Sequence, residues 1–107
     1  MITIDNIIKE TRKVAAENPD YVYPNKRGTY VGCPCIFGVV LSNLFPDKDL
    51  SEYDKPLGTT IDSVLQDILG ENLDKQKVRW CSYVQEYQDD EISWGQCVIN
   101  ADKKVKI

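Results

Sequence analysis

Cysteine is the residue with the widest chemistry in this chain of 107 residues. Four are present, Cys33, Cys35, Cys81 and Cys97, and the first two are separated by one residue. Thiolates at these four positions would make a zinc site, but zinc-ligand pairs usually lie two to four residues apart. Cys81 and Cys97 fall at apolar helical positions, where cysteine behaves as a small hydrophobe. The sequence favours cysteines in the core and leaves a cysteine-metal structural module as an alternative.

Catalysis by a cysteine would need an activating partner. Cys35 falls in the first turn of an expected helix, where the helix dipole lowers the pKa of a thiol. The chain contains no histidine, the commonest general base. We therefore expect a non-enzymatic protein that carries no cofactor, with Cys35 buried.

Aromatic and amide side chains form a second candidate set. Tyr and Trp anchor protein interfaces and stack on ligand rings, and amides can read polar edges. Gln85 and Asp89 are i,i+4 neighbours that could face a polar cleft, although a solvated helix face is the plainer interpretation. The candidates for binding a ligand or partner are Tyr21, Tyr23, Tyr30, Arg79, Tyr83, Gln85, Tyr87, Gln88, Asp89 and Trp94.

Charge and hydropathy restrict the class of partner. The net charge is −4, with a local acidic cluster over residues 86–91, and this counts against nucleic acid, whose binding depends on basic residues. No basic, then apolar N-terminal segment resembles a signal peptide. No apolar run approaches the roughly 20 residues that span a bilayer. We expect a cytoplasmic protein without a membrane partner.

The elements that must position these residues are mainly helical. Apolar spacing, caps and proline or glycine stops predict helices at 4–17, 34–45, 59–69, 75–89 and 94–103. The second is apolar nearly all round, so we expect it to be the buried central helix. Thr59 with Asp62, and Ser93 with Gln96, resemble capping boxes. Two β-prone segments predict a small hairpin near 21–31. The predicted fold is one mainly α domain over 1–107 with a minor β part (α+β).

Three runs carry a family resemblance. They are residues 14–23 (VAAENPDYVY), residues 35–38 (CIFG), and the spaced set Trp80, Tyr83, Val84, Gln85, Gln88, Asp89, Ser93, Trp94, Gly95, Val98, Ala101 and Asp102. In this order the chain resembles small uncharacterised proteins encoded by bacteriophages, especially those of actinobacteria. The loop 46–58 and the Cys33-Pro34 pair depart from that pattern. The resemblance implies an intracellular phage or prophage accessory product and no enzymatic activity.

Two functions follow as hypotheses. The first is a non-enzymatic protein that binds and modulates a host protein, such as a defence or regulatory factor. The second is a small-ligand protein that sequesters a nucleotide signal, stacking its base on tyrosine or tryptophan. A symmetric homodimer is the default expectation for an interaction protein of this size.

Overall fold

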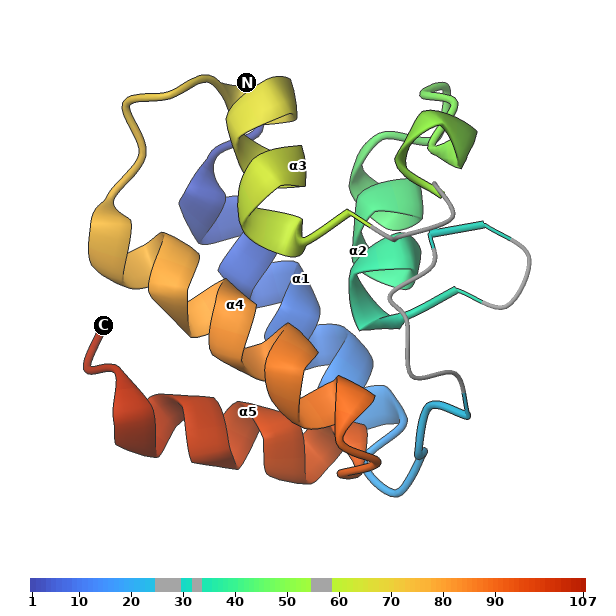
Figure 1. The fold of residues 1–107 in the computed structure, drawn as a ribbon, viewed down its shortest axis with the longest axis vertical. Helices are drawn as coiled ribbons and strands as arrows, with labels where there is room; N and C mark the ends of the chain where they lie inside the picture. Colours follow the sequence, from blue (N-terminus) through green and yellow to red (C-terminus); the bar gives the residue numbers. More distant parts are fainter. Residues whose placement is uncertain (25–29, 32–33, 55–58) are drawn as a thin grey trace.

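The computed structural model describes residues 1–24, 30–31, 34–54 and 59–107 (Figure 1). Its elements in chain order are α1 (Ile4–Glu17), α2 (Ile36–Leu44), the 3₁₀ turn η1 (Ser51–Tyr53), α3 (Ile61–Leu69), α4 (Lys75–Asp89) and α5 (Trp94–Lys104). The prediction of a mainly helical chain is confirmed. The bounds predicted for α1 and α4 match at both ends, and α5 continues one residue further than predicted. The 3₁₀ turn lies where the sequence predicted only loop.

Two of the predicted helix starts differ in their capping chemistry. Cys35, with extended backbone angles, caps α2, so this helix begins at Ile36 rather than at residue 34. Thr60 rather than Thr59 is the cap residue of α3, and its side chain bonds no backbone N–H there. Glutamines of α4 supply the missing acceptors, as described below. The first N–H group of each of these two helices therefore bonds a side chain that is distant in the sequence.

The start of α5 also depends on a distant segment. Ser93 is its cap residue but makes no side-chain capping bond, so the predicted Ser93–Gln96 capping box is wrong. Instead, the N–H of Trp94 donates to the carbonyl of Tyr21 at 2.9 Å, and the N–H of Gly95 donates to the carbonyl of Pro19 at 3.0 Å. The segment that follows α1 thus caps the last helix.

The predicted hairpin is not present in the described residues. Residues 21–24 and 30–31 form no strand, and 25–29 lie outside the described part. The N–H groups of Tyr30 and Val31 donate to the two carboxylate oxygens of Asp54, at 2.6 and 3.1 Å, while the Tyr21 carbonyl bonds α5. Side-chain and helix-end partners therefore replace the cross-strand ladder that the β-prone residues predicted.

The position at the centre of the fold belongs to α4 rather than to α2. α4 packs against α5 most extensively and also contacts α1, α2 and α3, whereas α2 packs chiefly on α1. In Figure 1, α4 runs diagonally between α3 and α5. The inner face of α2 is buried as expected, through Ile36, Phe37, Val40 and Leu41. Amphipathic α4 can serve as the hub because its two buried glutamines bond to neighbouring helices.

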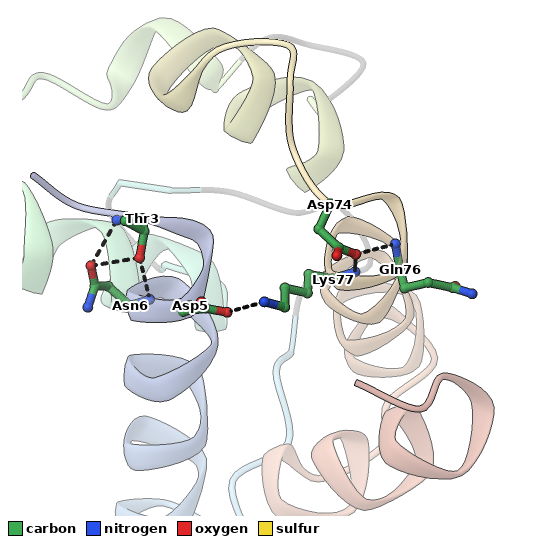
Figure 2. Close-up of polar contacts among 6 residues, drawn as sticks. All are labelled: Thr3, Asp5, Asn6, Asp74, Gln76 and Lys77. Carbon is green, nitrogen blue, oxygen red and sulfur yellow. Dashed lines mark hydrogen bonds and ion pairs between the residues drawn. The ribbon is translucent and has the colours of Figure 1, made fainter.

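The N-termini of α1 and α4 lie next to each other (Figure 2). Thr3 and Asn6 form a reciprocal capping box on α1, and Asp74 accepts from the N–H groups of Gln76 and Lys77 on α4. The ammonium group of Lys77 pairs with Asp5 at 2.6 Å. The charge of Lys77 is therefore neutralised within the chain.

A polar cluster ties α1, α4 and α5 together. Arg12 donates two hydrogen bonds of 2.8 Å to Asp102, and the indole N–H of Trp80 donates to the same carboxylate at 2.8 Å. The Arg12 guanidinium lies 4.9 Å from the centre of the Trp80 ring. These bonds hold the pKa of Asp102 below its usual range.

None of the helices in the described ranges has the length and hydrophobicity needed to cross a bilayer.

Candidate functional site

Gln85 and Gln88, predicted as binding residues, are buried inside the fold. The side-chain oxygen of Gln88 accepts from the N–H of Ile36 at 2.6 Å, at the start of α2. That of Gln85 accepts from the N–H of Ile61 at 2.8 Å, at the start of α3. Each glutamine oxygen thus accepts from one of the backbone N–H groups that have no partner within the helix at its N-terminus. Their oxygens serve the fold and are not free for a ligand.

Tyr30 belongs to the same buried network. Its hydroxyl donates to the carbonyl of Thr59 at 2.6 Å and accepts from the amide of Gln85 at 3.0 Å. Its ring packs edge-on against Tyr53, with centroids 6.1 Å apart. Burial raises the pKa of the Tyr30 hydroxyl. Tyr30 is a fixed neutral donor between the segment before α3 and α4.

Tyr21, Tyr23 and Trp94 lie around the start of α5. Tyr23 is fully buried and Trp94 nearly so. The Trp94 indole N–H donates to the oxygen of Gln88 at 3.2 Å. Tyr21 is 42% exposed and packs edge-on against Trp94, with centroids 4.6 Å apart. Only Tyr21 of these three offers surface, and part of its ring is covered by Trp94.

The described cysteines are buried and form no disulfide with one another. Burial raises the pKa of the thiols of Cys35, Cys81 and Cys97, each to about 12. They are therefore neutral thiols at physiological pH, and thiolate is the form that binds metal. No group of three or more Cys, Asp or Glu residues suited to a metal occurs in the described part of the chain. Cys33 lies outside it.

Asp89 and Gln85 line one hollow between the start of α3 and the C-terminal half of α4. Its volume is about 440 Å³, and its lining consists of Thr60, Asp62, Ser82, Gln85, Glu86, Asp89 and Asp90. Burial raises the pKa of Asp89 to about 6, and the hydrogen bond that Gln88 donates to it opposes this shift. We call this feature the carboxylate hollow, because the described residues that line it include four carboxylates and no cation.

The other predicted residues form a surface on the opposite flank of α4, toward α5. Tyr83 and Tyr87, one helical turn apart, stack with centroids 6.0 Å apart. The Arg79 guanidinium lies 6.0 Å, and the Lys104 ammonium 5.7 Å, from the centre of the Tyr83 ring. Both rings are partly exposed, and neither hydroxyl has a hydrogen-bond partner among the described residues. We call Arg79, Tyr83, Tyr87 and Lys104 the tyrosine surface.

The ten predicted residues thus separate by their surroundings. Five of them are interior: Gln85, Gln88, Tyr23, Tyr30 and Trp94. The hollow is bordered by Asp89 and also by Gln85, and Tyr21 is the half-exposed neighbour of Trp94. The tyrosine surface contains the other three, Arg79, Tyr83 and Tyr87. The sequence analysis did not identify Lys104, Asp62 or the polar cluster around Asp102 as parts of these sites. The basic C-terminal residues were the available signal for Lys104.

Comparisons of the chain with protein-family models, curated proteins and solved structures return no match. The functional argument therefore rests on the residues of this chain.

Proposed function

We propose that the protein is a non-enzymatic phage- or prophage-type accessory protein that binds and modulates a host protein. The observation that carries the proposal is the tyrosine surface. Tyr83 and Tyr87 keep aromatic area at the surface, with hydroxyls that no described residue bonds. Tyrosine and arginine are the residue types in which interface binding energy concentrates.

The flanking cations strengthen this interpretation. Arg79 and Lys104 lie beside Tyr83 and form no ion pair with any described carboxylate. A cation over an aromatic face can still accept a carboxylate from outside. The host segment that fits the surface is therefore one with apolar and acidic side chains.

The nucleotide-binding alternative receives less support from the geometry. Its amides and most of its aromatic rings bond within the fold. The hollow that Gln85 and Asp89 do border presents carboxylates, which repel phosphate. A cysteine-metal module is likewise opposed by the neutrality of the described thiols.

Affinity capture from a lysate of the host bacterium tests the proposal. A specific host protein should be retained by the wild type and lost by Tyr83→Ala/Tyr87→Ala. Ile99→Ala is the matched control, because Ile99 is 49% exposed on α5 outside the surface. Calorimetry with the purified host protein should then give at least about tenfold weaker binding for the double variant. A partner retained equally by the double variant would contradict this assignment.

A further inference from the structure

The outer side of α4 carries four charges in one line. Lys75, Arg79, Glu86 and Asp90 are all exposed, and at 100° per residue they fall within a stripe about 60° wide and about 22 Å long. We call this line the charged ridge. None of the four forms an ion pair with a described residue, whereas the nearby Lys77 is already paired with Asp5 (Figure 2). The four charged groups of the ridge are therefore available to pair with charges on a partner.

The order of these charges opposes the helix itself. The first turn of α4 contains no acid and its last turn no base; the two cations lie in its N-terminal half and the two carboxylates at its C-terminal end. Anions favour helix N-termini and cations favour C-termini. The ridge thus costs α4 stability within one molecule, and an oppositely ordered surface would recover that cost.

The spacing identifies such a surface. The midpoint between Arg79 and Glu86 falls between Ser82 and Tyr83, and the midpoint between Lys75 and Asp90 falls at the same place. A two-fold axis through that point places a second α4 antiparallel to the first. Arg79 then faces Glu86 of the second copy, and Lys75 faces Asp90. A symmetric contact requires this self-complementarity.

We propose that two copies of this chain pair antiparallel through the charged ridge of α4, in the register that joins Arg79 to Glu86 and Lys75 to Asp90. The carboxylate hollow adds to the attraction, because Glu86 and Asp90 belong to its lining, in which no described residue is a cation. The cations of the second copy lie at its edge. Ser82 and Tyr83, both partly buried, meet across the axis. Arg79 and Tyr83 belong to both this contact and the tyrosine surface, whereas Tyr87 and Lys104 lie on the α5 flank. The pairing goes beyond the proposed host interaction because it needs a second copy of the chain and the carboxylates of α4.

Charge exchange between the two ridge positions tests the register. Arg79→Glu sets two carboxylates against each other across the axis, and Glu86→Arg sets two guanidinium groups against each other, so each variant alone should be monomeric. Mixed one to one, the two variants should form a heterodimer that joins opposite charges at both of the 79–86 contacts and retains the Lys75–Asp90 pairs. The double variant Arg79→Glu/Glu86→Arg restores opposite charges at both contacts and should dimerise by itself. Misfolding cannot explain this pattern, since each reversal improves the charge order of α4.

Sedimentation velocity over a concentration series at low salt is the measurement. We expect the dissociation constant to rise at least about tenfold in each single variant and to return to within about threefold of the wild type in the double variant. Lys13→Glu is the matched control for Arg79→Glu, since it makes the same change in net charge at an exposed position of α1, and it should dimerise normally. Tyr87→Ala should also dimerise, which separates this proposal from the host interaction. A monomeric wild type, or a dimer that both reversals leave intact, would overturn the pairing.

Discussion

Gln88 of α4 holds the first N–H of α2, since its side-chain oxygen lies 2.6 Å from the nitrogen of Ile36. The same oxygen accepts from the indole of Trp94. One buried side chain thus satisfies donors from two other helices, and it connects the core to Asp89 at the edge of the carboxylate hollow.

Replacing Gln88 by leucine should lower the free energy of unfolding by about 3 kcal/mol. The substitution leaves the N–H groups of Ile36 and Trp94 buried without an acceptor, and each such donor costs about 1–3 kcal/mol. Urea denaturation followed by circular dichroism measures the loss. Gln96→Leu is the control, because Gln96 is exposed and its side chain bonds Asn100 alone among the described residues. A Gln88→Leu protein as stable as the control would refute the role assigned to this oxygen.

Gly38→Ala should destabilise the protein by about 2–3 kcal/mol, although alanine is the better helix former. A β-carbon at this position would lie 2.7 Å from the Pro34 side chain and 2.9 Å from the backbone of Tyr30. α2 would have to move away from the segment that contains the buried Tyr30. Thermal unfolding of the variant beside the wild type provides the measurement. An unchanged or raised melting temperature would contradict the close contact of Gly38 with Pro34 and the backbone of Tyr30.

Asp89 should make the fold less stable as the pH rises from about 4 to above 6. Its pKa is raised to about 6 in the folded state by burial, so the folded protein holds this proton more tightly than the unfolded chain does. The stabilising contribution is present below about pH 4 and is lost as the pH passes through 6. The neighbouring thiols of Cys35 and Cys97 and the Tyr30 hydroxyl stay neutral in this range, while Asp90, Glu86 and Asp62 share the hollow.

Asp89→Asn isolates this effect, because asparagine resembles the protonated carboxyl. At pH 8 the free energy of unfolding of the variant should exceed that of the wild type by about 1 kcal/mol, a figure reduced for solvent screening of a half-buried group. Near pH 4 the two free energies should be equal. Denaturation at both pH values and one low protein concentration measures the difference. A difference independent of pH would mean that Asp89 titrates normally.

Glu91→Gly should stabilise the protein by a few tenths to about 1 kcal/mol. Glu91 follows α4 with a φ of 65°, a left-handed conformation that costs a side chain about 1 kcal/mol and costs glycine little. Glu91→Ala separates this effect from the loss of charge, since alanine keeps the β-carbon and its strain. Chemical denaturation should therefore rank glycine above alanine. Equal stabilities would contradict a strained backbone at this position.

Much of the helical framework could be predicted because it depends on local chemistry. The apolar spacing and cap of α1, and the stretch between Asp74 and Asp89, are properties of neighbouring residues. The starts of α2 and α3, and the capping of α5, could not, because Gln88, Gln85 and the carbonyls of residues 19 and 21 supply their acceptors from distant segments. The same non-local bonds explain the failed hairpin, since Asp54 takes the N–H groups of Tyr30 and Val31.

The candidate site divides in the same way. A polar side chain on α4 looks the same in the sequence whether it faces solvent or a neighbouring helix end, so Gln85 and Gln88 were grouped with Arg79 and Tyr83. The exposures of the two glutamines, 5% and 0%, separate them from the surface pair. The i,i+4 relation of Gln85 and Asp89 did place both residues beside one hollow. Lys104 could be joined to Tyr83 only once the packing of α5 on α4 was known.

The bonds from Pro19 and Tyr21 to the start of α5 have a consequence for biosynthesis. The last helix leaves the ribosome long after the segment that caps it, and α4 must also wait for α5 to cover it. The faces of α1 and α4 that pack on α5 therefore stay uncovered in the nascent chain until α5 has been synthesised.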